Sequence, residues 1–220
     1  MSDSQLRAII FDFDLTLADS SRGFIACHRF AAGRFGLTPP SPEAIAASIG
    51  TPLDLVFPRF YGEEHAALAQ DYVRVYQEHA DEVMTGLTVM LEGAAEAVQR
   101  LRNVGYNLGI VSQKLRYRVE DVLRRESLLE CFGVVLGGDD IPAFKPDPRG
   151  LQMAIEQLGA TASTALYIGD TTIDAEAARN AGVRFIAVLS GATGAEDFER
   201  YAPQAVLASV AELPSFLAGH

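Results

Sequence analysis

Short apolar runs of strand length alternate with segments of helical periodicity along most of the chain. The apolar runs lie at residues 6–11, 107–111, 133–136, 165–168 and 183–189. Between them, apolar residues recur three and four positions apart, as in Ala94, Ala97, Val98 and Leu101, which is the spacing of an amphipathic helix. Strands that alternate with helices form parallel sheets covered by helices. The pattern therefore predicts an α/β fold built on a parallel sheet.

One stretch, from about residue 20 to about residue 84, has helical spacing and contains no convincing strand. Phe24, Cys27, Ala31 and Phe35 share one helical stripe, and Ser41-Pro42 has the form of a helix cap followed by a first turn. A second stripe contains Leu68, Tyr72, Val75, Tyr76 and His79. We expect a core domain of residues 1–18 and 86–220 and an inserted α-helical cap of residues 19–85. The insertion follows the first strand, so we expect it over the carboxyl edge of the sheet, where ligands bind in open α/β folds.

Composition and charge narrow the classes of partner. The 220 residues are 49% hydrophobic and 21% charged, and the net charge is −11. This favours a folded domain over a disordered chain and disfavours nucleic acid or an anionic membrane as partner. Cys27 and Cys131 have neither disulfide-framework nor zinc spacing, which predicts a reducing, cytoplasmic location. His28, His65 and His79 lack metal-ligand spacing and are expected to be solvated.

Polar residues that could take part in catalysis or metal binding lie just past the predicted strands. Asp12 and Asp14 follow the first strand, and because extended residues alternate faces they can project into the same space. Ser112 follows the second, and a loop after the third ends in Lys145-Pro146. Asp170 and Asp174 follow the fourth. The carboxyl ends of parallel strands share one edge, so we expect these side chains at that edge.

Each of these residues also has an ordinary structural explanation. Asp12 and Asp14 could form a surface turn, Ser112 could cap a helix, and Lys145 could be a solvated loop charge. Asp174 could be a solvated acid in a first helical turn. These explanations do not account for the order in which all of the residues occur along one edge.

Four segments resemble, in their order along the chain, the four motifs of the haloacid dehalogenase-like hydrolase superfamily. They are Asp12-x-Asp14-x-Thr16, Ser112, Lys145-Pro146 and Gly169-Asp170-x-x-x-Asp174. The resemblance spans the whole chain and implies a Rossmann-like parallel sheet core. The insertion after the first motif resembles the helical-cap branch, which includes phosphoglycolate phosphatases, pyrophosphatases and β-phosphoglucomutase.

The resemblance implies specific roles for the acidic residues. Asp12 would be the nucleophile that forms an aspartyl phosphate, and Asp14 would act as general acid and then general base. Mg²⁺ would bind Asp12, the backbone carbonyl of Asp14, and Asp170. Asp174 would either bind the metal or hold a metal-bound water or Lys145.

The remaining motif residues would hold the phosphoryl group. Lys145, Ser112 and backbone amides around Phe13 would bind its oxygens, and Thr16 would orient the first loop. Gln113 replaces an asparagine common in the second motif and is a candidate for substrate contact. Leu15 replaces a glycine common after the second Asp, and a leucine there predicts ordinary backbone angles.

The substrate class is less determined than the chemistry. Asp14 disfavours a haloacid dehalogenase, which lacks an acid at this position, and favours a phosphatase acting on a small phosphate ester such as phosphoglycolate. A β-phosphoglucomutase-type phosphomutase and an inorganic pyrophosphatase stay open, as does a phospho-aspartate signalling or binding module without enzymatic activity. In the insertion, Arg22, Arg29, Arg34, Arg59 and Arg74 could bind a second anionic group. We expect a monomer or a homodimer.

Overall fold

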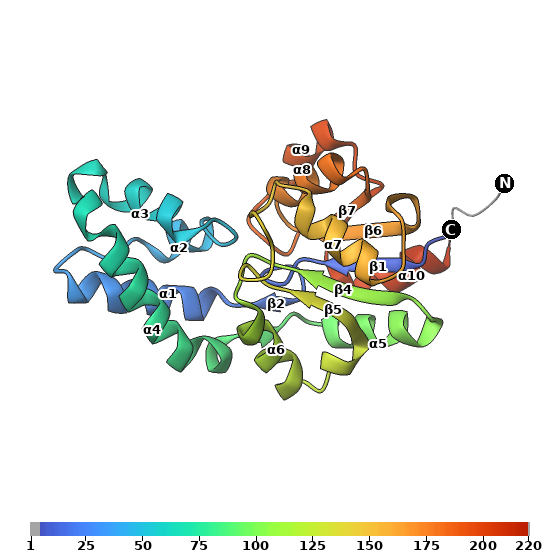
Figure 1. Ribbon diagram of the computed structural model, residues 1–220, viewed down its shortest axis with the longest axis horizontal. Coiled ribbons are helices and arrows are strands. Elements are labelled where there is room, and N and C mark those ends of the chain that lie inside the picture. Colours follow the sequence, from blue (N-terminus) through green and yellow to red (C-terminus); the bar gives the residue numbers. More distant parts are fainter. Residues whose placement is uncertain (1–4, 220) are drawn as a thin grey trace. The chain divides into compact units, whose positions relative to one another are not determined.

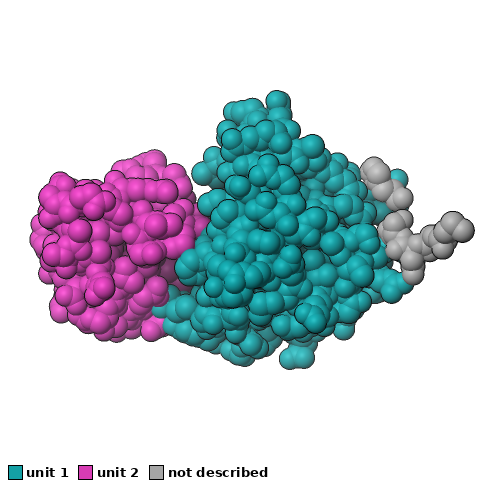
Figure 2. Space-filling view, turned by 45° about the horizontal axis from the view of Figure 1, so that its top comes forward, with its two compact units in different colours: residues 1–18, 90–220 teal, residues 19–89 magenta. Residues whose placement is uncertain are grey.

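The computed structural model describes residues 5–219, and the chain divides into two compact units (Figure 2). Unit 1 comprises Met1–Ala18 and Met90–His220, and unit 2 comprises Asp19–Val89. Strands β2 (Ala18–Asp19) and β3 (Val89–Met90) pair with each other where the chain passes between the units.

Unit 1 is built on a parallel sheet of six strands within the described residues, in the order β5-β4-β1-β6-β7-β8 (Figure 1). Every pairing between neighbouring strands of this sheet is parallel, so the prediction of a parallel α/β sheet is confirmed. The strands are β1 (Ala8–Phe11), β4 (Asn107–Val111), β5 (Phe132–Leu136), β6 (Ala165–Gly169), β7 (Arg184–Val188) and β8 (Ala205–Leu207).

Helices cover both faces of this sheet, as expected for parallel strands joined by crossovers. Apolar residues of α5, α6 and α10 pack in one cluster with one face, and residues of α7, α8 and α9 pack in a second cluster with the other. The helices are α5 (Ala94–Val104), α6 (Arg116–Arg125), α7 (Arg149–Gln157), α8 (Thr172–Ala181), α9 (Ala195–Phe198) and α10 (Leu213–Ala218). Short 3-10 helices lie at Leu129–Cys131, Ala162–Thr164, Glu199–Tyr201 and Val210–Glu212.

Strand β1 is central and explains the position of the site. All four of its residues are fully buried because the sheet is covered on both faces. Its neighbours β4 and β6 lie on opposite sides of it, so the connections turn in opposite directions at its carboxyl end. Such a switch point is where ligands bind in open α/β sheets.

The edge strand β8 was missed from the sequence. It has three residues, and only Leu207 of these is buried, so its apolar signal is too short to distinguish a strand from a loop. The other expected strands are present, with ends that differ by no more than two residues.

Unit 2 is helical. Its helices are α1 (Ser21–Arg34), α2 (Pro42–Ala46), α3 (Leu53–Tyr61) and α4 (Ala69–Leu87), with a 3-10 helix at Glu63–Leu68. Cys27 and Ala31 of α1 pack with Tyr72 and Tyr76 of α4, the residues that the two stripes placed on apolar faces. The helices approach closely because Gly23 has no side chain: a Cβ there would lie 2.5 Å from Met84 Sδ. Ser41 caps α2 as expected, accepting a hydrogen bond from the Ala44 N–H.

The expectation that His28 is solvated was wrong. Its side chain is 1% exposed and lies among Phe60, Tyr72 and Tyr76, because it shares the buried face of α1 with Cys27. Nδ1 lies 2.8 Å from the Tyr72 hydroxyl, and within the described chain Nε2 has no hydrogen-bond partner. Burial lowers the pKa of His28 to about 4, since the charged ring would lose its hydration.

We expect acid to destabilise unit 2 through His28. The pKa rises from about 4 in the folded chain to its ordinary 6.5 on unfolding, so stability is lost as the pH falls from 6.5 towards 4. Between pH 7 and pH 5 this contributes a loss of about 2 kcal/mol in the free energy of unfolding. Urea titrations at both pH values should show that His28→Gln removes most of this loss. His65→Gln, at a side chain that is 38% exposed, should keep the wild-type pH dependence, and equal behaviour of the two variants would contradict the prediction.

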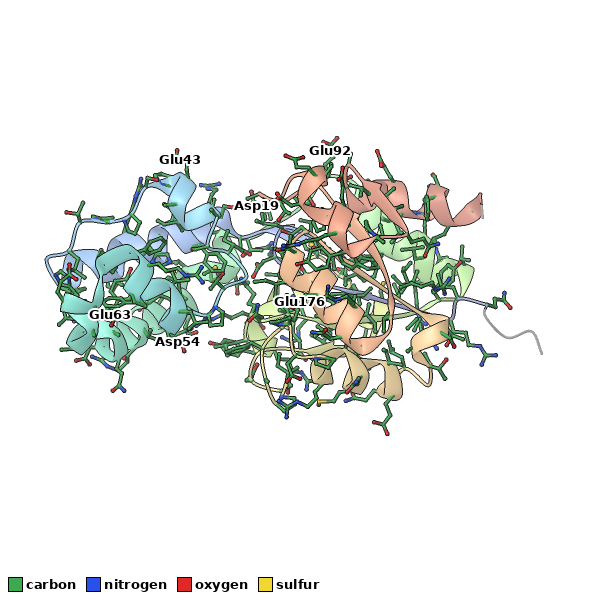
Figure 3. The ribbon with its side chains drawn as sticks, turned by 90° about the horizontal axis from the view of Figure 1, so that it is seen from above. Asp19, Glu43, Asp54, Glu63, Glu92 and Glu176 are labelled. Carbon is green, nitrogen blue, oxygen red and sulfur yellow. The ribbon has the colours of Figure 1, made fainter. Side chains whose placement is uncertain are left out.

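Both units carry exposed acidic side chains. Glu43, Asp54 and Glu63 of unit 2 and Glu92 of unit 1 are exposed and point outward (Figure 3). Across residues 5–219, no helix has both the length and the apolar character required to cross a membrane.

Candidate active site

The candidate site lies where three strands of unit 1 end together. Phe11 of β1 is in register with Ile110 of β4 and Ile168 of β6. Asp12, Ser112 and Asp170 come directly after these strands. The ladder continues one step further at Asp12, whose N–H donates to the Ile168 carbonyl over 2.9 Å. The register therefore brings residues about 100 and 160 positions apart to one edge of the sheet.

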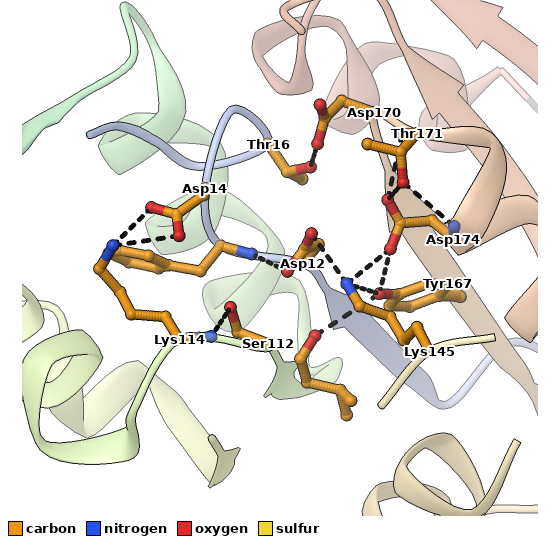
Figure 4. A network of polar contacts seen from close by, with 12 residues as sticks. Asp12, Asp14, Thr16, Ser112, Lys114, Lys145, Tyr167, Asp170, Thr171 and Asp174 are labelled. Carbon is orange, nitrogen blue, oxygen red and sulfur yellow. Dashed lines mark hydrogen bonds and ion pairs between the residues drawn. The ribbon is translucent and has the colours of Figure 1, made fainter. Parts of the chain in front are cut away.

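Three buried carboxylates gather around one lysine at this edge (Figure 4). Asp12, Asp170 and Asp174 each offer an oxygen, and these oxygens lie within 4.8 Å of one another. Lys145 Nζ lies 2.8 Å from Asp12 Oδ2 and 2.7 Å from Asp174 Oδ1. Three ionised carboxylates and one ammonium leave a charge of −2, which a single divalent cation would balance.

The ionisation of the cluster follows from burial and mutual charge. Burial raises the pKa of Asp12 to about 6; Lys145 opposes the shift and Asp174 adds to it. Burial, followed by the charges of Asp174 and Asp12, also holds the pKa of Asp170 well above its ordinary value. For Lys145, burial by itself would lower the pKa, but the charges of Asp12 and Asp174 outweigh it and raise the pKa. The cluster therefore has excess negative character that an added cation would relieve.

The chemistry of the cluster fits Mg²⁺. This ion prefers carboxylate and carbonyl oxygens and is commonly held by one or two carboxylates together with substrate phosphate. The three aspartates supply only oxygen ligands, and no histidine or cysteine is in the group. Asp12, Asp170 and Asp174 are thus the residues that could hold the ion through side chains.

Asp174 is held by two further side chains. Thr171, the N-cap of α8, accepts a hydrogen bond from the Asp174 N–H, and its own N–H and hydroxyl donate to Asp174 Oδ2 over 3.1 and 2.5 Å. The Tyr167 hydroxyl donates to Asp174 Oδ1 over 2.8 Å and accepts from Lys145 Nζ over 3.1 Å. Tyr167 could not be identified from the sequence, because an aromatic residue inside an apolar strand gives no signal of a polar contact.

The loop after β1 approaches Asp170 through Thr16. Its hydroxyl donates to Asp170 Oδ1 over 2.9 Å. The expectation of ordinary backbone angles at Leu15 was wrong, since Leu15 has φ 59°, in the left-handed region that costs a non-glycine residue about 1–2 kcal/mol. Two hydrogen bonds hold this conformation: the Leu15 N–H donates to the Ala18 carbonyl over 2.7 Å, and the Ser190 hydroxyl donates to the Leu15 carbonyl over 2.6 Å.

Gly191, next to Ser190, packs directly against the Asp170 carboxylate. This contact was not predicted from the sequence. A Cβ at Gly191 would lie 2.0 Å from Asp170 Oδ2. We expect Gly191→Ala to displace this carboxylate and to weaken binding of a divalent cation at the three aspartates by about 10- to 100-fold. Titration with Mg²⁺, followed by the rise in the unfolding temperature, measures this. Gly33→Ala, where a Cβ meets nothing within 4 Å, is the control, and an unchanged affinity for Mg²⁺ in Gly191→Ala would contradict the expectation.

Asp14 lies in a separate ion pair with a residue that the sequence analysis missed. Lys114 Nζ contacts Asp14 Oδ1 at 2.9 Å and Oδ2 at 3.0 Å, and both side chains are buried. The Lys114 N–H donates to Ser112 Oγ over 3.3 Å, which links this pair to the end of β4. One signal could have found Lys114: the chain contains sixteen arginines but only two lysines, Lys114 and Lys145.

Phe13 and Gln113 have limited roles in the geometry. The Phe13 side chain is fully buried in the core, while its N–H donates to Asp12 Oδ1 over 2.7 Å. The backbone of Gln113 packs against the loop after β5, where a Cβ at Gly138 would lie 2.5 Å from the Gln113 carbonyl oxygen. The structure therefore brings Asp12, Thr16, Lys145, Asp170 and Asp174 into one contact network, with Asp14 and Ser112 joined through Lys114.

Comparisons with known proteins agree with this geometry. A family model described as haloacid dehalogenase-like hydrolase matches residues 9–188. The chain is 30% identical over 213 residues to Pyrophosphatase PpaX of Bacillus velezensis, covering 97% of each chain. A solved structure from Bacteroides fragilis, described as a haloacid dehalogenase-like hydrolase, has 35% identity and a TM-score of 0.90, covering 95% of this chain and 100% of that one. A predicted phosphoglycolate phosphatase from Haemophilus somnus shares the fold, with 21% identity, a TM-score of 0.88 and coverage of 97% and 98%.

Proposed function

Because the chain belongs to the haloacid dehalogenase-like hydrolases and is a phosphatase, we propose that it uses Mg²⁺ to hydrolyse a small phosphorylated metabolite through an aspartyl phosphate. The observation that carries this proposal is the position of Asp12, which follows β1 and contacts Lys145 beside Asp170 and Asp174. A carboxylate placed there can act as a nucleophile towards a phosphoryl group whose charge the surrounding cations offset.

Asp12 is the proposed nucleophile. The Phe13 N–H on Oδ1 and Lys145 on Oδ2 set the orientation of its carboxylate. A carboxylate oxygen attacks phosphorus, the bond from phosphorus to the leaving oxygen breaks, and an acyl phosphate forms on Asp12. Water then attacks phosphorus, the bond to Asp12 breaks, and inorganic phosphate leaves with the carboxylate restored.

Asp14 is the proposed proton carrier. It gives a proton to the leaving oxygen in the first step and takes one from the attacking water in the second, so it returns to its starting state. In the structure Asp14 contacts Lys114, whereas Asp12 contacts Lys145, so the two carboxylates have different cationic partners. To carry a proton, Asp14 must turn one oxygen away from Lys114.

The other motif residues would bind the phosphoryl group or position the residues that do. Lys145 and the Ser112 hydroxyl would hold oxygens of the transferring phosphoryl group, with the Gln113 side chain nearby, and Thr16 would position Asp170 through its hydrogen bond. Mg²⁺ would be held by Asp12, Asp170 and the backbone carbonyl of Asp14. Asp174 would bind it directly or through water. The positive charge of the ion would reduce the repulsion between the substrate phosphate and the carboxylates.

The proposal also covers the substrate class, the cellular location and the oligomeric state. We propose that unit 2 is a helical cap and that it restricts the enzyme to small substrates such as phosphoglycolate. Hydrolysis of inorganic pyrophosphate is a second candidate, favoured by the relative named Pyrophosphatase PpaX. Cys27 and Cys131 form no disulfide within the described residues, which supports the proposal of a cytoplasmic setting. We also propose a monomer or homodimer.

Phosphate release from a substrate panel tests the proposal. With Mg²⁺, we expect turnover of 2-phosphoglycolate or pyrophosphate above that of hexose phosphates and nucleotides. EDTA should abolish this turnover, and added Mg²⁺ should restore it. Isomerisation of β-glucose 1-phosphate would instead indicate a mutase. No turnover of any ester, with beryllofluoride still binding, would indicate a regulatory or binding protein.

A further inference from the structure

The chain has two lysines, and both are buried beside the proposed reacting carboxylates. Lys145 forms an ion pair with Asp12, and Lys114 forms one with Asp14. The Lys114 side chain is 4% exposed. Every other basic position apart from the histidines is an arginine. A lysine ammonium is a compact point charge with three donors on a flexible stem, and it can exchange partners more easily than a bidentate guanidinium.

The backbone that carries Lys114 is tightly held. The Gly138 N–H donates to the Lys114 carbonyl over 2.9 Å, and the Lys114 N–H donates to Ser112 Oγ. A Cβ at Gly137 would lie 2.2 Å from the Arg116 nitrogen, so the loop after β5 packs directly on this segment. The backbone that positions Lys114 is therefore fixed by contacts with the loop after β5.

The contact with Asp14 places Lys114 on the leaving-group side of the proposed reaction. In the structure both oxygens of Asp14 face Lys114 Nζ. To act on the leaving oxygen, Asp14 must turn one of them away from Lys114. A buried ammonium that loses an acceptor is costly unless another acceptor takes its place.

We propose that Lys114 is a specificity residue that binds a negative charge carried by the leaving group. The substrate class is then phosphate compounds whose leaving group has its own anion, such as a carboxylate or a second phosphate, in preference to esters of neutral alcohols. This inference rests on the proposed function, because Asp14 defines the leaving-group side.

A matched pair of substrates tests the inference. 2-Phosphoglycolate and 2-hydroxyethyl phosphate are similar in size and differ in the carboxylate of the leaving group. We expect kcat/KM to favour 2-phosphoglycolate in the wild type and expect Lys114→Met to reduce that ratio by about tenfold or more, with Lys114→Arg retaining part of it. Arg116→Met, at a 49% exposed cation of the same segment, should leave the ratio unchanged. Equal losses for both substrates in Lys114→Met would overturn the inference and leave Lys114 as a support for Asp14 alone.

A binding measurement separates this inference from the proposed function. With 13Cε-labelled lysine, the protein has two lysine side-chain signals, which Lys114→Arg assigns. In the presence of Mg²⁺, methylenediphosphonate should shift both signals, whereas methylphosphonate should shift the Lys145 signal alone. If the wild type hydrolyses no ester, the proposed function fails, yet a Lys114 shift specific to methylenediphosphonate still supports the anion site. No such shift overturns the inference whether or not the enzyme turns over.

Discussion

Asp12→Asn is expected to lower the turnover of every phosphate ester by about 10⁴-fold or more, because an amide cannot replace the carboxylate that we propose as the nucleophile towards phosphorus. The same change removes one of the three carboxylates near Lys145, so it also lowers the negative charge available to Mg²⁺. Phosphate release under saturating substrate and Mg²⁺ measures the effect. The fold should survive, since Asn has nearly the same volume and retains an oxygen that can accept from the Phe13 N–H.

A matched control and a trapping measurement make this prediction specific. Asp54→Asn changes an exposed acid of unit 2 and should leave turnover unchanged. Wild-type protein quenched during turnover of 32P-labelled substrate should carry acid-stable, base-labile label, and Asp12→Asn should carry none. Turnover of Asp12→Asn within tenfold of the wild type would exclude Asp12 as the nucleophile.

Lys145→Met is expected to reduce both stability and activity. The change leaves the buried carboxylates Asp12 and Asp174 without their shared cation, and removing one partner of a buried ion pair costs about 3–5 kcal/mol. We expect that loss in the free energy of unfolding at pH 7 in EDTA, measured by urea titration. Turnover with Mg²⁺ should fall by about 10³-fold, since the cation proposed to stabilise the transferring phosphoryl group is lost.

The response to Mg²⁺ distinguishes this explanation from a simple packing defect. A divalent cation supplies positive charge to the same carboxylates, so Mg²⁺ should restore part of the stability of Lys145→Met and should stabilise it more than the wild type. Arg149→Met removes an exposed cation at the start of α7 that pairs with Asp147 and should change stability by less than about 1 kcal/mol. A stability loss in Lys145→Met that does not respond to Mg²⁺ would argue against charge compensation.

The strand ends show how far the sequence could lead. Asp12, Ser112 and Asp170 each follow an apolar run, and parallel register alone requires that such residues share an edge. This is why the fold and the edge that carries the motifs were predictable. His28 shows the limit: helical spacing placed Cys27 on a buried face, yet burial of its polar neighbour depended on the aromatic residues supplied by α3 and α4.

The contacts between segments decided the rest. Local sequence determined the parallel sheet, the helical character of residues 20–84 and the N-cap of α2. It also determined which polar residues follow the strands. Periodicity, capping and strand ends are properties of neighbouring residues, so they can be read without the fold. Only the tertiary structure placed Lys114 on Asp14, Tyr167 between Lys145 and Asp174, and Gly191 against Asp170. It also placed Leu15 in a left-handed conformation held by Ser190 from 175 residues away. Such pairings depend on the distances between side chains that the packed sheet brings together, and those distances are not encoded in the local pattern of the chain.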